Sequence, residues 1–132
     1  MIRKFISNLN TITHIALHKN GENLLAGTKD GNVAWFQLDM SDKPFKSMDY
    51  HGDKIRSVEF HNSYPLFLSC SRNGKLLVYH ATLNDDTLRD PVIVPLKSLK
   101  PNGETMYNYS CFHSIHPWIF TCGEDKLIRL WS

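Results

Sequence analysis

Apolar residues along this chain fall in short runs that end at turn-forming residues. The middle of the chain shows three such runs, Ile55–Phe60, Leu66–Ser71 and Lys75–Tyr79. No segment keeps a helical period over three turns. Short runs bounded by glycine, asparagine and aspartate predict β-strands. The sequence therefore predicts an all-β protein.

Tight turns join the second and third strands of this pattern. Arg72-Asn73-Gly74 and Lys29-Asp30-Gly31 both end in glycine, which adopts positive φ without steric cost. Asp125-Lys126 occupies the same place near the end of the chain, with lysine in place of glycine. We expect Asp125 to take up the extra backbone strain there.

The strand pattern is part of an internal repeat. Three segments align without gaps around His18, His61 and His113, which are 43 and 52 residues apart. A turn residue follows each histidine by twelve residues, and an aromatic residue (Phe36, Tyr79 or Trp131) follows six residues later. This spacing is typical of four-stranded propeller blades with one insertion. Such repeats stack on one another, which favours a binding surface over a catalytic pocket.

The period divides the chain into about three blade equivalents of a β-propeller. Residues 1–10 are expected to hold an outer strand (Arg3–Ser7) of a preceding blade, and residues 11–50 and 51–100 one blade each. Residues 101–132 are expected to form a last, incomplete blade. Further outer strands are predicted at Pro44–Met48 and Leu96–Leu99, and the polar insertion near 83–91 is predicted to be an exposed loop. The side chains expected between blades are Phe60, Leu66, Leu68, Val78 and Leu130.

Composition and charge narrow the classes of protein to which this chain can belong. The chain has 132 residues and a net charge of +2, too small by itself to predict nucleic-acid binding. No apolar run reaches the roughly 18 residues of a membrane span, and the N-terminus is too short and polar for a signal peptide. Three cysteines without a C-x-x-C motif fit a reducing compartment.

No residue pattern predicts catalysis. The repeated histidines fall on successive blades, so they cannot converge on one metal ion. Cys111, His113 and His116 are the nearest cluster, but the loop carries His116 away from the strand. Trp35, Trp118 and Trp131 are interpreted as packing between blades. We predict no catalytic residue, no metal and no cofactor, and therefore no enzyme.

The repeats resemble WD repeats, through the I-R-L-W ending, the tight Asp turns and the histidine before a first strand. In that family a histidine, a serine or threonine, an aspartate and a tryptophan form a hydrogen-bonded network. The resemblance assigns partial networks here: Asp30 with Phe36 in the first repeat, His51, Ser69, Asn73 and Tyr79 in the second, and Thr121, Asp125 and Trp131 in the third, where Gly103 stands at the histidine position. No repeat carries the complete set.

Longer strings resemble one group of WD-repeat proteins. They include A-W-F-Q-L-D-M-S-D-K-P-F, D-P-V-I-V-P-L-K-S-L-K and the ending H-P-W-I-F-T-C-G-E-D-K-L-I-R-L-W-S. These are similar to the C-terminal region of the block-of-proliferation family, called eukaryotic ribosome biogenesis protein in yeasts. The resemblance implies a non-catalytic scaffold of the nucleolus and nucleoplasm that supports large-subunit assembly and maturation of the 5.8S and large-subunit rRNAs. It implies a Pescadillo-type protein and a second WD-repeat factor as partners in the pre-60S particle.

Two other functions stay open. Direct binding of pre-rRNA would use basic residues that the turns bring to one side, namely Lys29, Lys54, Arg56, Arg72, Lys75 and Lys126. Interleaved acidic residues dilute that patch. The WD repeats alone would also allow a generic adaptor, such as a substrate receptor of a ubiquitin ligase.

The strand count leads to one more expectation. Three blade equivalents are fewer than the four to eight of a closed propeller, and the resemblance implies a seven-bladed parent. Open strand edges and apolar flanks would invite pairing between copies. We therefore expect a dimer in which each N-terminal strand completes the partner's last blade.

Overall fold

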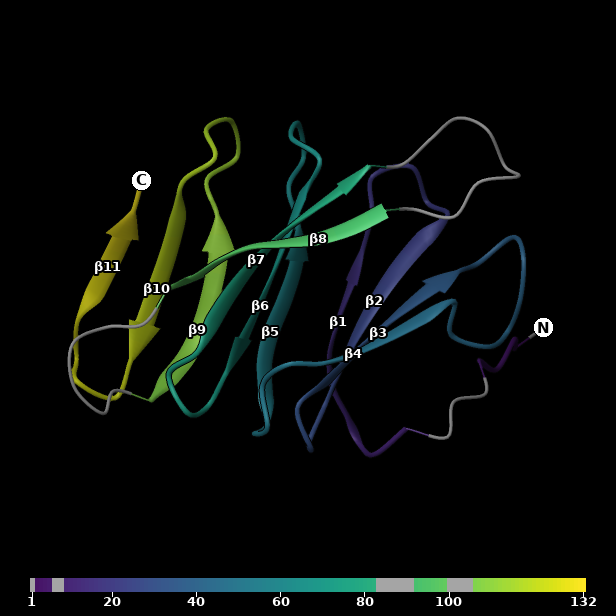
Figure 1. The fold of residues 1–132 in the computed structure, drawn as a ribbon, viewed down its shortest axis with the longest axis horizontal. Helices are drawn as coiled ribbons and strands as arrows, with labels where there is room; N and C mark the ends of the chain where they lie inside the picture. The colour runs from purple at the N-terminus through teal and green to yellow at the C-terminus, as the bar shows by residue number, and fades with distance from the viewer. Residues whose placement is uncertain (1, 6–8, 83–91, 100–105) are drawn as a thin grey trace.

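The computed structural model describes residues 2–5, 9–82, 92–99 and 106–132, with the backbone alone at residues 82 and 92–99 (Figure 1). The strands in this part of the chain are β1 (Ile12–Leu17), β2 (Asn23–Thr28), β3 (Asn32–Gln37), β4 (Lys46–Asp49), β5 (Ile55–Phe60), β6 (Leu66–Ser71), β7 (Leu76–Thr82), β8 (Val92–Leu99), β9 (Tyr107–Phe112), β10 (Ile119–Gly123) and β11 (Ile128–Trp131). The predicted all-β class is confirmed. Among the described residues, no helix is long and apolar enough to cross a membrane.

The strands form three antiparallel sheets that follow chain order. Blade 1 is β1-β2-β3-β4 and blade 2 is β5-β6-β7-β8, while the described strands of blade 3 are β9-β10-β11. The sheets stand side by side, and their first strands β1, β5 and β9 run in the same direction (Figure 1). This arrangement is that of successive propeller blades.

Several strands differ in length from the prediction. β5 and β6 match it, whereas β4 begins two residues later than predicted, and β7 and β8 are longer. The expected outer strand at Arg3–Ser7 is wrong over the described residues 2–5, which have no regular structure. Instead, Phe5 packs edge-on against Phe36 with ring centroids 5.8 Å apart, and Arg3 donates to Asp42 at 2.7 Å. The predicted loop at 83–91 lies outside the described residues.

Blades 1 and 2 pack face to face through an aromatic core. Trp35 of β3 meets Phe60 and Phe67 of blade 2 at ring-centroid distances of 5.3 and 5.5 Å. Phe67 stacks on Tyr79 at 4.3 Å within blade 2. Such ring pairs add to the stabilisation that burial of their apolar surface provides. The other core members are Leu25, Val33, Met48, Ile55, Val58, Leu77 and Ala81.

Blade 2 uses its opposite face to pack against blade 3. Leu68, Cys70, Leu76 and Val78 form this second core, with Tyr107, Phe112 and Ile119 from blade 3 and Leu66 and Trp131 packed at its border. Four of the five side chains expected between blades are therefore found in the two cores. Leu130 is the exception: it is 52 % exposed, because it lies on the face of β11 that points away from blade 2.

Hydrogen bonds between the first strands fix how neighbouring blades are aligned. The Val58 N–H donates to His14 Nδ1 at 3.2 Å, and the Ser110 N–H donates to Ser57 Oγ at 3.0 Å. His14 and Ser57 each lie four residues before a repeated histidine, so the same position makes the same bond at both blade junctions. Each bond gives a partner to a backbone N–H at the junction of two blades.

The tight turns have the backbone geometry that the residue types predict, with one correction. Gly31 and Gly74 have φ of 95° and 82°. In the third turn the strained residue is Lys126, with φ of 66°, and not Asp125 as expected. The reason is that the turn needs positive φ at the position after the aspartate, whichever residue occupies it.

Truncation of a side chain between blades 2 and 3 should destabilise the protein. Leu68 is fully buried, so Leu68→Ala should lower the free energy of unfolding by about 2–5 kcal/mol. The exposed Leu130 is the matched control, and Leu130→Ala should cost less than about 1 kcal/mol. Denaturant unfolding at low protein concentration measures both. Equal losses in the two variants would show that the blade assignment is incorrect.

Candidate interaction surfaces

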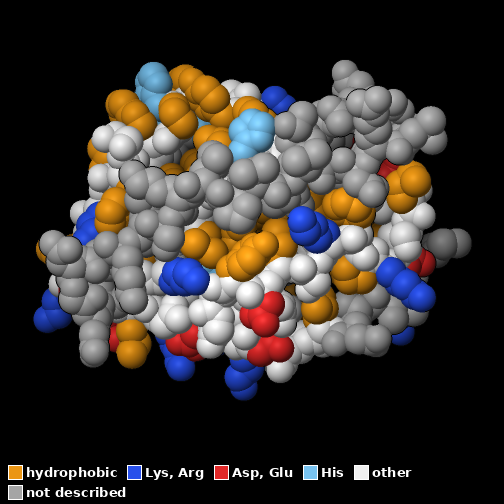
Figure 2. Space-filling view, viewed as in Figure 1, with side chains coloured by type: hydrophobic (Ala, Val, Ile, Leu, Met, Phe, Trp, Pro, Cys, Tyr) orange, Lys and Arg blue, Asp and Glu red, His pale blue; other side chains and the backbone are white. Residues whose placement is uncertain are grey.

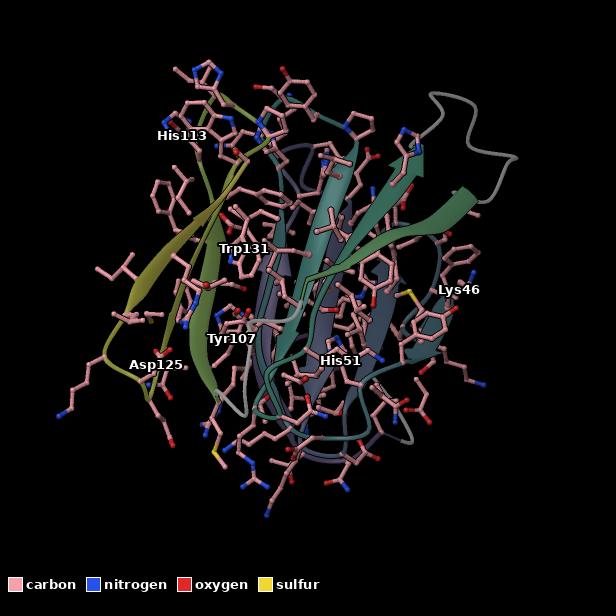
Figure 3. All side chains as sticks on the ribbon, turned by 60° about the vertical axis from the view of Figure 1, so that its left-hand side comes forward. Lys46, His51, Tyr107, His113, Asp125 and Trp131 are labelled. Carbon is pink, nitrogen blue, oxygen red and sulfur yellow. The ribbon has the colours of Figure 1, made fainter. Side chains whose placement is uncertain are left out.

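The turns of the three blades form two opposite faces with different chemistry. Turns β2–β3, β6–β7 and β10–β11, with residues 50–54 before β5, form the charged turn face at the lower edge of Figure 1. Turns β1–β2, β5–β6 and β9–β10 form the histidine turn face at the upper edge. Figure 2 shows many of the charged side chains near the lower edge, and hydrophobic and histidine side chains gathered at the upper left. Figure 3 places His51 and Asp125 at one end of the blades and His113 at the other.

The six basic residues predicted as a partner or RNA face lie at or near the charged turn face. Arg72 pairs with Asp53 at 3.3 Å, and Lys75 Nζ donates to the Tyr50 carbonyl. Arg56 is half-buried in β5, and its Nε has no hydrogen-bond partner among the described residues. The remaining three are Lys29 and Lys126, which are exposed in turns, and Lys54, which is half-buried. Two of the six basic side chains, Arg72 and Lys75, are therefore already bound by neighbouring acceptors.

The second repeat holds a buried hydrogen-bonded network. His51 Nε2 lies 2.6 Å from Ser69 Oγ, and Ser69 Oγ lies 3.1 Å from the Tyr79 hydroxyl. Asn73 Nδ2 donates to the His51 carbonyl at 3.1 Å, which ties the β6–β7 turn to the segment before β5. Burial, followed by the charge of Lys75, lowers the pKa of His51 to about 4. Burial also raises the pKa of Tyr79 to about 12. Both side chains are therefore neutral at neutral pH.

The first repeat makes a different contact from the one assigned by resemblance. Thr28 Oγ1 donates to Asp30, and this bond lowers the pKa of the Asp30 carboxyl. The aromatic donor is Trp35, whose Nε1–H bonds to Asn23 Oδ1 at 2.8 Å. Phe36 points to the other face, where it packs against Phe5. Sequence reasoning missed Asn23 and Trp35 because they lie on the opposite face of blade 1, toward blade 2, from the aromatic position that the repeat alignment follows.

The third repeat keeps one bond of the assigned set. Trp131 Nε1 donates to Thr121 Oγ1 at 3.0 Å, across β10 and β11. Asp125 pairs with Arg129 and accepts the Leu127 N–H at 3.2 Å, so it supports its own turn. Gly103 lies outside the described residues. Across the three blades these polar groups stabilise turns and sheets.

The histidine turn face contains residues whose role sequence reasoning did not identify. Nδ1 of His18 accepts the Asn20 N–H at 3.1 Å, that of His61 accepts the Ser63 N–H at 2.9 Å, and that of His113 accepts the Ile115 N–H at 3.1 Å. The repeated histidine thus caps the turn after each first strand. His61 Nε2 also donates to the His116 carbonyl of the next blade at 2.9 Å. The exact recurrence of histidine was the available signal.

Trp118 is placed differently from the prediction. Trp35 and Trp131 belong to the packing between blades, whereas Trp118 is 37 % exposed on the histidine turn face. Its ring stacks on His116 at 4.6 Å, and His116 stacks on His113 at 5.1 Å. Trp118 lies just before β10, and the turn leaves it at the surface.

Two of the three cysteines have thiols whose pKa is raised. Burial raises the pKa of the Cys70 thiol to about 11 and also raises the pKa of Cys111, the opposite of what activates a nucleophile. Within the part of the chain that the structure describes, no group of three or more His, Cys, Asp or Glu could hold a metal ion.

The family model described as "WD domain, G-beta repeat" matches residues 1–36, 42–80 and 95–132. The chain is 38% identical over 130 residues to "Ribosome biogenesis protein BOP1 homolog" of Arabidopsis thaliana, covering 98% of this chain and 17% of the relative. It is 38% identical over 137 residues to "Ribosome biogenesis protein bop1-A" of Xenopus laevis, covering 100% and 18%. It is 37% identical over 137 residues to "Ribosome biogenesis protein ERB1" of Kluyveromyces lactis, covering 100% and 17%. The chain thus spans less than a fifth of the length of these curated relatives.

The buried His51 should make stability depend on pH. Its pKa is about 4 in the folded protein and 6.5 ordinarily, so between these values only the unfolded chain binds the proton. Stability is then complete above the ordinary pKa and falls as the pH decreases toward 4, by about 3 kcal/mol in total. His51→Gln should remove this part of the pH dependence. Unfolding free energies of both proteins across that pH range provide the measurement.

Ser69→Ala is the matched control, because it removes a hydrogen bond but leaves the buried ring in place. Burial is the main cause of the lowered His51 pKa, so this variant should keep the pH dependence. The same slope in the wild-type and His51→Gln proteins would contradict the assignment.

Proposed function

Since this chain belongs to the WD-repeat family and corresponds to a WD-repeat region of the BOP1 type of ribosome biogenesis protein, we propose that it is a non-catalytic scaffold in assembly of the large ribosomal subunit. In this role the blades hold assembly factors on the pre-60S particle while the 5.8S and large-subunit rRNAs mature. The site of action is the nucleolus, with passage through the nucleoplasm.

One observation supports a scaffold above all: the polar side chains that could perform chemistry bond to their own fold. His51, Ser69 and Tyr79 are joined by hydrogen bonds inside blade 2, and among the described residues only His51 Nδ1 of these groups is left without a partner. The repeated histidines cap turns through Nδ1. A network used in this way keeps the blades and turns rigid, and rigid turns present their exposed side chains to a partner with little loss of entropy.

The partners that fit this proposal are those of the resembling family, a Pescadillo-type protein and a second WD-repeat assembly factor. The charged turn face is the surface we propose for one of them. Arg72 is the proposed anchor, because it is exposed in the β6–β7 turn and its planar guanidinium binds carboxylates in a bidentate manner. Its pairing with Asp53 orients the side chain before a partner arrives.

Direct binding of pre-rRNA is the second candidate, and the exposed Lys29 and Lys126 at the ends of the β2–β3 and β10–β11 turns favour it. Phosphate contacts release counterions, so RNA affinity should fall steeply as salt increases. A protein partner held mainly by packing should be far less sensitive to salt.

Reversal of the charge at Arg72 should weaken association without unfolding the protein. The Arg72–Asp53 pair is half exposed at Arg72, so its loss should cost at most about 1 kcal/mol of stability. Capture of the tagged chain from nuclear extract, scored for large-subunit assembly factors, should decrease several-fold for Arg72→Glu. Lys46→Glu is the matched control, since Lys46 is exposed on the outer strand β4, away from this face (Figure 3).

Binding of purified Arg72→Glu to a pre-rRNA fragment and to the second WD-repeat factor, each across a salt series, separates the two candidates. Loss of binding to RNA alone would replace the scaffold proposal by the RNA proposal. Unchanged binding to both would remove the charged turn face from consideration.

Self-association is proposed for the isolated chain. Phe120, Cys122, Ile128 and Leu130 lie on the face of blade 3 that points away from blade 2, and Ile128 and Leu130 are exposed. β11 is also an edge strand among the described strands of its sheet. An exposed apolar face beside a free strand edge favours pairing between copies. The N-terminal strand expected in this contact is not formed at residues 2–5, so the contact is proposed through blade 3 itself.

Light scattering on the purified chain tests this. The mass should rise from about that of one chain, 15.2 kDa, toward twice that value as concentration increases. Leu130→Asp should shift the equilibrium toward the monomer, because it places a charge on the apolar face. A monomer at all concentrations would exclude self-association.

A further inference from the structure

The histidine turn face contains an open pocket between blades 1 and 2. Its volume is about 250 Å³. Trp35, Phe60 and Ala81 belong to its lining, and all three are members of the core between the two blades. The exposed residues Asn62–Pro65 of the β5–β6 turn line its mouth. The pocket therefore reaches from solvent to the aromatic core.

The size of the pocket suits a single side chain. Cavities that hold drug-sized ligands begin at about 300 Å³, whereas an apolar cavity of about 150 Å³ holds one benzene ring. The Trp35 and Phe60 rings meet edge-on at 5.3 Å, and His18 meets Phe60 edge-on at 5.0 Å. Such walls offer both ring faces and ring edges to an inserted aromatic group.

Lys19 gives the described lining of the pocket a positive charge. Lys19 is an exposed residue of the lining. Among the described residues, the lining contains no carboxylate. His18 accepts the Asn20 N–H through Nδ1, so its neutral ring carries its proton on Nε2 and is a donor. Burial lowers the pKa of His18, which keeps the ring neutral. The lining therefore combines an apolar floor with a cation and a hydrogen-bond donor.

We propose that this pocket is a docking site for a linear peptide segment that inserts a phenylalanine-type side chain and places an adjacent carboxylate near Lys19. The apolar floor selects the aromatic anchor, and the exposed ammonium group of Lys19 selects an acidic neighbour over a basic one. The site lies on the face opposite Arg72, so it goes beyond the proposed scaffold contact and can fail without affecting it.

The test uses the ¹⁵N-labelled chain and short capped peptides of Gly, Phe and Asp, with Phe-Asp and Asp-Phe as the two orders. One of these peptides should shift the amide signals of Lys19, Asn62 and Ser63 and the indole signal of Trp35 in a saturable manner. Replacement of Phe by Ala in the peptide should weaken binding more than tenfold. Replacement of Asp by Lys should weaken it about two- to fivefold, as expected for an exposed charge pair.

Lys19→Glu should reverse the charge preference, so that the Lys peptide binds better than the Asp peptide. Lys19 is exposed, so this variant should fold, and Lys4→Glu is the control with the same charge change on the exposed N-terminal segment. The proposal is overturned if no peptide gives saturable shifts at the pocket or if Lys19→Glu leaves the preference unchanged. It is also overturned if a single-stranded RNA oligonucleotide shifts the same signals at lower concentration than the peptides do.

Discussion

Each sheet of this protein is apolar on both faces, and the rest of the structure follows from the need to cover both. Blade 2 meets the need on each side: Phe67 and Tyr79 face blade 1, and Leu68 and Val78 face blade 3. A sheet of this kind cannot be stable alone, because one uncovered face would expose most of its apolar residues to water. On blade 1, the far face carries Phe36 and is covered in part by Phe5 and Leu9 of the N-terminal segment.

Burial of apolar surface holds the blades together but does not set their register, because it has no direction. The hydrogen bonds between first strands supply the direction. Val58 donates to His14, Ser110 to Ser57 and Phe112 to Glu59, each from the backbone of one blade to a side chain of the blade before it. His61 adds a bond to the His116 carbonyl at the end of the same seam. These bonds fix how far one blade slides along the next.

The same construction gives the two turn faces different chemistry. Turns after the second strands are short and rich in charge, whereas turns after the first strands carry the capping histidines and exposed rings such as Trp118 and Tyr64, which is 44 % exposed. Since both sets of turns are anchored to one rigid stack, a partner on one face need not disturb a partner on the other. A scaffold that holds two ligands at a fixed separation requires this property.

Local sequence by itself determined the strands and turns of the repeat: β5 and β6 end where their apolar runs end, and glycine marks positive φ at residues 31 and 74. It also pointed to Ser69 and His51, through the resemblance to WD repeats. Tertiary structure decided what local pattern leaves open. Leu68 and Leu130 are both leucines on strands of the repeat, yet one is fully buried and the other is 52 % exposed. Phe36 packs against the N-terminal segment while the neighbouring Trp35 bonds to Asn23 on the opposite face, and Lys126 took the strain expected of Asp125. The physical reason is that burial and hydrogen-bond partners come from the neighbouring blade, which the sequence of a single repeat does not contain.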